Sequence, residues 1–466
     1  MRLSNLSSLS LPYRSSISRQ QPTPTSVFSL VKYASSLYQQ QPQPPSVAHR
    51  HYTNMYALPK TKMDQRFHVL MMEALNGEKV TTSQSDVAMT ITKRLLQTEG
   101  KNTNLVFSPL SIHILLSLIA AGSNGPTLDQ LLSFLKSNSI DQLNQFTSEI
   151  TSMVLANGSK KGGPRLSFAS GVWLDRSLSP KPSFKHLAQT AYKANIAQAD
   201  FKNKADEVIS EVNSWAEKHA NGIIKEILGP KSIGSSTMLI MANALYFKAA
   251  WEQKFAALNT KEYKFYLLDG NSVMAPFMHS SMKQYVAAFE GFKVLAMPYE
   301  QGHDQRRHFS MYIFLPDEKD GLASLIEKLD SEPGFIDRHI PYEKREVQKF
   351  MIPKFKISFG VELTEALKGL GLTLPFHGGL TEMVEPQVGA EDPFVSVILQ
   401  KSFIEVNEQG TDAAAVSVSR MLGRCPSDLT VRIDFVADHP FLYVLREDTT
   451  GTLLFVGQLL NPLVSK

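Results

Sequence analysis

The chain has 466 residues, of which 43% are hydrophobic and 20% charged, and its single cysteine, Cys425, excludes an internal disulfide. Residues 1–63 hold seven Lys or Arg and no Asp or Glu, so subtracting these seven from the net charge of +4 leaves −3 on the remaining 403 residues. This mildly acidic body has no basic cluster with interleaved aromatic residues, which argues against nucleic acid as a partner. The longest apolar run, around residues 114–121, is too short to span a membrane, so no membrane partner is expected either.

Residues 1–63 form a separate segment with 12 Ser, 7 Pro and a Gln/Pro tract at residues 39–45. Such a composition buries too little apolar surface to fold, so we expect a disordered N-terminal extension. A serine-rich, arginine-bearing and acid-free segment is typical of a plastid or mitochondrial transit peptide. Two alternatives stay open: a disordered tail, or an upstream extension in which Met63 is the working start.

Globular patterning begins near residue 83. Apolar residues at helical spacing predict a helix over residues 87–96, and Ser108-Pro109 supplies an N-cap and a first-turn proline for a buried helix over 109–121. Further helices are predicted over residues 127–135, 140–155, 183–195 and 206–221. Strands are predicted over residues 166–174, 239–247, 273–278, 292–298, 309–315, 349–359, 441–447 and 453–460. Helices dominate early and strands late, without regular alternation, which favours the α+β class.

The motifs of common enzyme active sites are missing. The chain has no G-x-x-x-x-G-K-[ST] loop, no H-E-x-x-H, no G-x-S-x-G and no Cys/His spacing of a metal site. We therefore expect no catalysis, no metal and no cofactor. The glycine-rich residues 158–163 are predicted to form a solvated hairpin turn, and residues 369–373 a helix C-cap. His113, beside an apolar helix face, is expected to be a hydrogen-bonded core histidine.

Residues 405–425 are the most informative stretch. Between residues 410 and 423 there are few large side chains, which indicates an exposed loop. Read at period two, one face carries only small, uncharged residues: Thr411, Ala413, Ala415, Ser417 and Ser419. The charges of Asp412 and Arg420 fall on the other face, as a loop that also becomes a buried strand requires. Arg420 and Arg424 are candidate protease cut sites, and an ordinary Ala/Ser linker is the alternative interpretation.

Motifs along the chain resemble the serpin family of protease inhibitors, most closely its plant branch. They include, in family order, Val106-Phe107-Ser108-Pro109-Leu110-Ser111-Ile112, Asn213-Ser214-Trp215, Asn243-Ala244-Leu245-Tyr246-Phe247-Lys248, Ile352-Pro353-Lys354-Phe355 and Asp434-Phe435-Val436-Ala437-Asp438-His439-Pro440-Phe441. The resemblance covers about residues 80–464. It implies one serpin domain over residues 64–466, with three β-sheets, eight to nine helices and an exposed reactive-centre loop over residues 408–428. It also implies a monomer, in the extracellular space (apoplast) or the cytoplasm.

In inhibitory members of this family a protease attacks the loop as a substrate, and the cut loop inserts into the main sheet before the acyl-enzyme hydrolyses. Counting from the hinge glycine, Gly410, places the scissile bond at Arg424–Cys425, with Arg420–Met421 as the rival. Arginine there implies a covalent complex with a trypsin-like serine protease, or with a papain-like or metacaspase-type cysteine protease. Cys425 is then a small neutral residue or a redox-sensitive thiol. The alternative function is that of a non-inhibitory serpin, acting as a carrier, chaperone or interaction protein.

The resemblance also assigns residues to three regions of the main sheet. The hinge comprises Glu408, Gly410, Thr411, Ala413, Ala414 and Ala415. The breach, where the loop first enters and a Lys–Glu salt bridge forms, comprises Lys354, Glu408 and Trp251. The shutter, a polar cluster beneath the centre of the sheet, comprises Ser108, Ser111, Asn243 and Gln400. Gln400 stands where the family usually has histidine, and since an amide both donates and accepts, we expect inhibition to survive this exchange.

Overall fold

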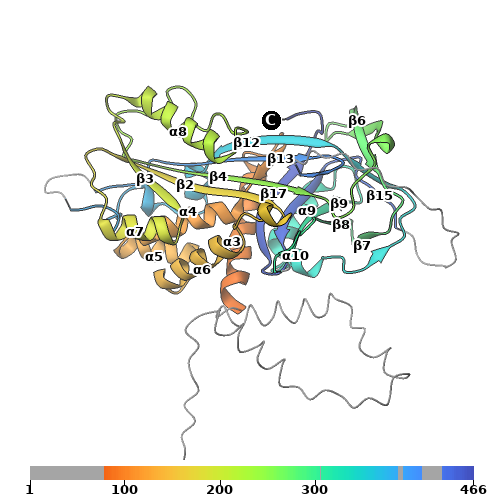
Figure 1. The fold of residues 1–466 in the computed structure, drawn as a ribbon, viewed down its shortest axis with the longest axis horizontal. Coiled ribbons are helices and arrows are strands. Elements are labelled where there is room, and N and C mark those ends of the chain that lie inside the picture. Colours follow the sequence, from red (N-terminus) through yellow and green to blue (C-terminus); the bar gives the residue numbers. More distant parts are fainter. Residues whose placement is uncertain (1–77, 305, 387–391, 412–432, 466) are drawn as a thin grey trace, which may run out of the picture. The chain divides into compact units, whose positions relative to one another are not determined.

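The computed structural model describes residues 78–304, 306–386, 392–411 and 433–465, which all lie in one compact unit, Leu58–Lys466. The described residues contain nine α-helices (Figure 1): α3 (Glu78–Gln97), α4 (Pro109–Ala121), α5 (Gly125–Phe134), α6 (Ile140–Met153), α7 (Pro182–Thr190), α8 (Ala205–His219), α9 (Leu322–Ser331), α10 (Phe335–Arg338) and α11 (Thr364–Gly369). Six of them precede residue 220, and strands dominate the rest of the chain.

The strands form three sheets. The first has seven strands, in the order β1 (Leu105–Phe107), β17 (Thr452–Leu459), β16 (Phe441–Glu447), β9 (Phe309–Pro316), β8 (Phe292–Pro298), β7 (Gln284–Phe289) and β10 (Lys344–Arg345). The second has four: β15 (Phe435–Val436), β11 (Phe350–Pro353), β6 (Ser272–His279) and β5 (Lys261–Tyr266). The third has six: β12 (Phe355–Glu362), β13 (Val397–Val406), β14 (Gly410–Thr411), β4 (Leu239–Ala250), β2 (Arg165–Asp175) and β3 (Ala194–Ala199). The predicted α+β fold with three sheets and eight to nine helices is confirmed.

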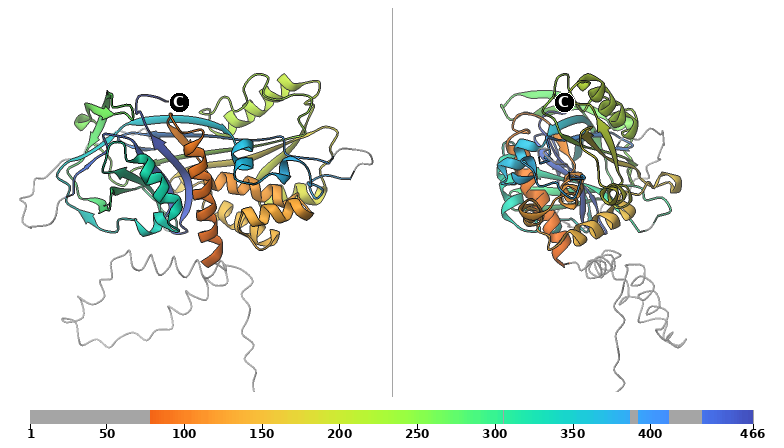
Figure 2. Two further views of the ribbon diagram at one scale, coloured as in Figure 1. Left: turned by 180° about the vertical axis from the view of Figure 1, so that it is seen from behind. Right: turned by 90° about the vertical axis from the view of Figure 1, so that its left-hand side faces the viewer.

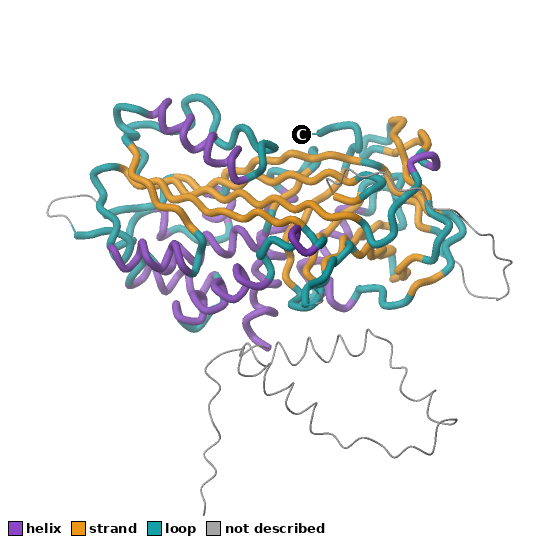
Figure 3. The backbone as a smooth tube through the Cα atoms, in the orientation of Figure 1, coloured by secondary structure: helices purple, strands orange, loops and turns teal. Residues whose placement is uncertain are grey.

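Helices cover both faces of the six-stranded sheet, as Figures 1 and 3 show and the views of Figure 2 repeat. On one face, Val212 of α8 packs with Ile240 and Leu399 in a small hydrophobic cluster. On the other lies α4, whose residues from Pro109 to Ala120 are all buried. The predicted N-cap is confirmed, because the Ser108 hydroxyl accepts a hydrogen bond from the backbone N–H three residues on. This capped end of α4 points at the centre of the sheet, where β13 and β4 meet.

The helix predicted over 87–96 begins earlier, at Glu78, and two other predicted elements each combine parts of different elements. The helix predicted over 183–195 ends at Thr190, Lys193 then takes a φ of 52°, and Ala194–Ala199 forms β3. The strand predicted over 349–359 is two strands of different sheets, β11 and β12, which part at Lys354. Both halves are rich in buried β-prone residues, so their periodicity does not reveal the change of sheet.

Three smaller predictions have mixed outcomes. Residues 158–163 do not form a hairpin; a 3-10 turn, Ser159–Lys161, connects α6 to β2. The predicted helix C-cap is confirmed, since α11 ends at Gly369 and Gly371 has a φ of 91°. His113 is a core residue as predicted, but neither ring nitrogen has a hydrogen-bond partner among the described residues, and its ring instead meets Phe146 edge-on at 5.4 Å. Burial lowers the pKa of His113 to about 4, so its imidazole is neutral at pH 7.

Candidate functional site at the hinge of the six-stranded sheet

A gap between two parallel strands defines the candidate site. β13 and β4 pair in parallel over residues 397–402 and 240–245. Beyond Ser402 their pairing stops, and β14 occupies the space between them. It is antiparallel to both neighbours, since Thr411 pairs with Val406 of β13 and with Ala249 of β4. The chain thus enters the six-stranded sheet, the main sheet of the family fold, at the end where β13 and β4 separate.

Both residues of β14 fit this position closely. Gly410 has a φ of 155°, and a Cβ there would lie 2.0 Å from the carbonyl oxygen of Ala249, so only glycine fits. Thr411 is 1% exposed, and its Oγ1 lies 2.7 Å from the hydroxyl of Tyr299. The side chain of Thr411 therefore faces the protein interior, as the period-two pattern predicts for this position.

The predicted breach pair forms beside this entry point. The Lys354 ammonium lies 2.9 Å from the Glu408 carboxylate, whose side chain is 12% exposed. Thr260 donates a second hydrogen bond to that carboxylate at 2.8 Å. Burial alone would raise the pKa of Glu408, but the hydrogen bonds from Lys354 and Thr260 outweigh it and hold the pKa below its ordinary value. Glu408, the first residue of the hinge, is therefore ionised and held in place.

Trp251, the third predicted breach residue, fixes the backbone around Glu408. Its indole N–H donates to the carbonyl oxygen of Asn407 at 2.9 Å, and its backbone N–H donates to that of Gln409 at 2.9 Å. The indole ring stacks on Tyr299, with centroids 4.4 Å apart. The structure thus brings the breach residues together at the start of the hinge, where Trp251 hydrogen-bonds the backbone on both sides of Glu408.

The four predicted shutter residues gather where β13 and β4 pair. Gln400 lies directly opposite Asn243 in the parallel ladder. Its amide oxygen accepts from the backbone N–H of Ser108 at 2.9 Å, and its amide nitrogen donates to the Ser108 carbonyl oxygen at 2.9 Å. The Ser108 hydroxyl accepts from the N–H of Ser111 at 3.2 Å. Gln400 therefore clamps β13 to the N-terminus of α4 through backbone atoms.

Sequence reasoning missed three side chains of this site. Ser170 of β2 accepts a hydrogen bond from Asn243 at 3.2 Å, Thr260 holds Glu408, and Tyr299 holds Thr411. Each contact joins residues far apart in the chain, so no local sequence pattern predicts it. The predicted residues Ala413, Ala414, Ala415, Arg424 and Cys425, the rival Arg420, and the extension over 1–63 lie outside the described residues.

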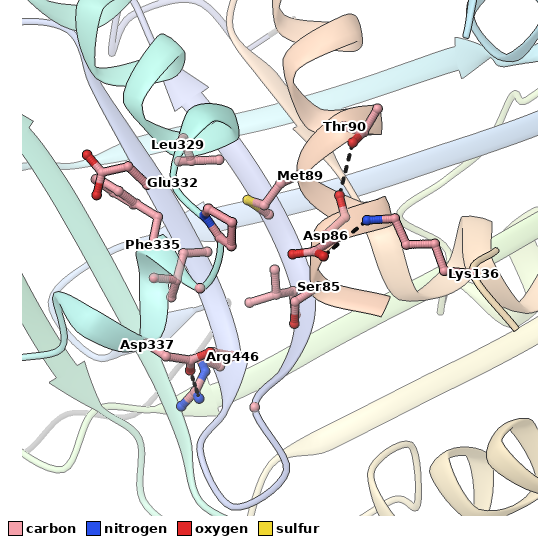
Figure 4. Close-up of a pocket in the computed structure, with 15 residues that line it drawn as sticks. Ser85, Asp86, Met89, Thr90, Lys136, Leu329, Glu332, Phe335, Asp337 and Arg446 are labelled. Atoms are coloured by element: carbon pink, nitrogen blue, oxygen red, sulfur yellow. Dashed lines mark hydrogen bonds and ion pairs between the residues drawn. The ribbon is translucent and has the colours of Figure 1, made fainter. Parts of the chain in front are cut away.

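No competing site emerges from the described part of the chain. A pocket of about 160 Å³ lies between α3, α10 and β17 (Figure 4), but its wall charges are in ion pairs: Asp86 with Lys136, Asp337 with Arg446, and Glu332 with Arg338 outside the wall. The described residues contain no cluster of His, Cys, Asp or Glu fit to hold a metal ion. None of the helices among them has the length and apolar character needed to cross a membrane.

Comparisons with known proteins identify the family. The family model described as serpin (serine protease inhibitor) matches residues 82–462. Serpin-ZX of Arabidopsis thaliana is 56% identical over 382 residues, which cover 82% of this chain and 97% of that protein. Serpin-ZXA of Oryza sativa subsp. japonica is 51% identical over 369 residues, covering 78% of this chain and 92% of that protein. The solved structure of Arabidopsis AtSerpin1 in its native stressed conformation matches with a TM-score of 0.77 and 53% identity, over 83% of this chain and 100% of that one. The chain therefore belongs to the serpin family of serine protease inhibitors.

Proposed function

We propose that this chain inhibits arginine-preferring proteases as a suicide substrate. The protease cleaves Arg424–Cys425 and forms an acyl-enzyme, and the cut loop inserts between β13 and β4 before the ester hydrolyses. The targets are trypsin-like serine proteases, or papain-like or metacaspase-type cysteine proteases, held in a covalent complex. The observation that carries the proposal is the seating of Gly410 and Thr411 between these two strands, because it is the first step of such an insertion.

The register of β14 predicts where an inserted loop would lie. Each added residue moves one position back along β4 from Ala249, and along β13 from Val406. On the face of Thr411, Ala413, Ala415, Ser417 and Ser419 would then lie opposite Phe247, Leu245, Asn243 and Met241. Phe247, Leu245 and Met241 belong to the main hydrophobic core. Small, uncharged side chains suit these positions because bulk would overpack the core and charge would be desolvated.

Ser417 is the inward residue that would meet the shutter. By the same register it lies opposite Asn243 on β4 and Gln400 on β13, the two residues that now face each other. Asn243 Oδ1 is buried and has no hydrogen-bond partner among the described residues. A serine hydroxyl inserted beside it supplies a donor, so the polar inward residue of the loop coincides with the polar part of the sheet.

Insertion of the loop would replace one ladder of strand pairing with two. The parallel ladder between residues 397–402 and 240–245 would be replaced by two antiparallel ladders, and antiparallel pairing is the more stable per residue. The 13 steps from Thr411 to Arg424 span about 43 Å at about 3.3 Å each. A protease bound at Arg424 is thus carried the length of the sheet.

The same register favours Arg424 over Arg420 as the cut site. Arg420 would lie opposite Val397 and Ile240, inside the sheet, so a protease joined to it would block the last step of insertion. Arg424 lies four residues farther on and clears the sheet. We further propose that residues 1–63 are a separate extension, and that the domain over 64–466 acts as a monomer without turnover, metal or cofactor.

The test mixes the full chain with trypsin and separates the products by denaturing electrophoresis. We expect a complex that survives boiling in detergent, with cleavage after Arg424. Ala415→Arg and Ala414→Arg form a matched pair, because they place the same charge on the inward and outward faces. Only the inward variant should turn the inhibitor into a substrate, with the share of trapped trypsin falling at least tenfold.

Two results would contradict the proposal. Equal effects of the two arginine variants would refute the insertion register. Clean cleavage at Arg424 with neither complex nor thermal stabilisation of the cleaved chain would identify a non-inhibitory carrier, chaperone or interaction protein.

A further inference from the structure

Tyr299 lies where the six-stranded and seven-stranded sheets meet. It directly follows β8, and its backbone N–H donates to the Phe309 carbonyl oxygen at 2.9 Å. The next backbone N–H, that of Glu300, donates to the carbonyl oxygen of Ala250 at the end of β4. The backbone of Tyr299 is thus fixed from both sheets, directly beside the entry point of β14.

The ring of Tyr299 is fixed as firmly as its backbone. It stacks on Trp251 with centroids 4.4 Å apart and meets Phe247 edge-on at 5.0 Å. The residue is 1% exposed, and its hydroxyl lies 2.7 Å from Thr411 Oγ1. Burial raises the pKa of Tyr299 far above its ordinary value, so the hydroxyl keeps its proton and stays available as a donor.

The hydrogen bond between Tyr299 and Thr411 is the only one that either hydroxyl makes within the described residues. Withdrawal of the hinge would leave the Tyr299 hydroxyl among aromatic rings without this partner. An unsatisfied buried hydroxyl is costly, so the bond favours the seated hinge over the withdrawn one. In the part of the chain that the structure describes, no other side chain hydrogen-bonds to that of Thr411, so Tyr299 is the residue that holds Thr411 in place.

We propose that Tyr299 is a positioning residue that keeps the hinge seated through Thr411, so that insertion of the cut loop extends an existing strand. The inference rests on the proposed function, because it concerns the speed of insertion relative to hydrolysis of the acyl-enzyme. Ordering the first residues of a new strand costs conformational entropy before its contacts form. A hinge that already lies in the sheet is ordered before cleavage, so insertion of the cut loop is faster relative to hydrolysis of the acyl-enzyme.

The test removes the hydroxyl and keeps the ring. Tyr299→Phe and Thr411→Val each delete the bond from one side, and the double variant shows whether they act through the same contact. Tyr443→Phe is the matched control: the Tyr443 hydroxyl is also buried, and it donates to the Leu105 carbonyl oxygen at 3.0 Å in the seven-stranded sheet. A general loss of one buried hydrogen bond affects all of these variants alike, whereas loosening of the hinge affects only those at Tyr299 and Thr411.

Two readouts separate positioning from mere stability. Hydrogen–deuterium exchange over residues 407–411 should quicken in Tyr299→Phe and Thr411→Val and stay unchanged in Tyr443→Phe. With trypsin, the ratio of cleaved chain to covalent complex should rise about fivefold in Tyr299→Phe, the equivalent of one hydrogen bond, while the rate of attack on the loop stays constant. The double variant should show no further rise.

The outcomes distinguish this inference from the proposed function. The inference alone is overturned if Tyr299→Phe forms the complex with an unchanged ratio of cleaved chain to covalent complex. It is also overturned if trypsin attacks the loop of this variant faster while that ratio stays constant. Unchanged exchange over residues 407–411 in Tyr299→Phe overturns it as well. If trypsin cleaves the wild-type chain without forming any complex, the proposed function is overturned. The role of Tyr299 in making insertion faster than hydrolysis then falls with it.

Discussion

Replacing Gln400 by leucine should loosen the closure between β13 and β4. The Gln400 amide makes two hydrogen bonds of 2.9 Å to the backbone of Ser108, which is fully buried. The Ser108 carbonyl also accepts from the N–H of Ile112 at 3.2 Å, so within the described residues only the Ser108 N–H is left without a partner. An orphaned buried N–H costs about 1–3 kcal/mol and the second lost bond about 0.5–1.5 kcal/mol. We therefore expect the native state to lose about 2–4 kcal/mol in the variant.

The assay must tell loss of closure from loss of stability. Gln458→Leu is the matched control, because the amide of Gln458 donates to the carbonyl oxygens of Gly100 and Thr103 and is buried in β17, away from the closure. The urea midpoint of the native chain should fall in both variants. Spontaneous conversion of the uncleaved chain to a thermostable form that no longer traps trypsin should accelerate only in Gln400→Leu. Equal acceleration in both variants, or none in Gln400→Leu, would refute the reasoning.

Two further predictions concern the entry point and the middle of the insertion path. Lys354→Ala removes the ammonium 2.9 Å from Glu408 and leaves Thr260 as its partner, so the native state should lose about 1 kcal/mol near pH 7. Because folding lowers the pKa of Glu408, the pair stabilises the chain above the unfolded-state pKa and ceases to do so as the pH falls through the folded-state pKa. Urea titrations should show the difference between wild type and variant shrinking on acidification, and a constant difference would contradict this account. Ser417→Val should cost the cleaved, inserted form about 1 kcal/mol and the uncleaved form nothing, with Ser417→Thr as control; equal losses in both forms would rule out the pairing with Asn243.

The parts of the fold that the sequence predicts well have local causes. Ser108-Pro109 predicts the start of α4 because a cap and a fixed proline φ act within one turn. The strands predicted over 292–298 and 441–447 match β8 and β16 to the residue. The choice of neighbour is not local: nothing in residues 350–362 indicates that β11 and β12 join different sheets.

The same distinction separates the predicted from the missed site residues. Resemblance in sequence supplied Gln400, Lys354 and Glu408, since these positions belong to recognisable motifs. β13, which carries Gln400, does not stand out by periodicity, because polar residues interrupt its apolar run. Tyr299 was missed because its partner lies 112 residues away and depends on how the hinge enters the sheet. A contact between residues so far apart in the chain leaves no period in the sequence around either of them.

Glutamine at position 400 also determines how the closure responds to pH. The neighbouring side chains of the cluster are Ser108, Ser111, Ser170 and Asn243, none of which titrates near neutral pH. A histidine at this place, with an ordinary pKa of about 6.5, would lose its acceptor nitrogen on protonation and so its bond to the Ser108 N–H. The amide of Gln400 keeps its acceptor at every pH, and Glu408 stays ionised because its pKa is lowered. The closure and the breach pair therefore keep the same strength from mildly acidic to neutral pH, so we expect neither to make inhibition pH-dependent in that range.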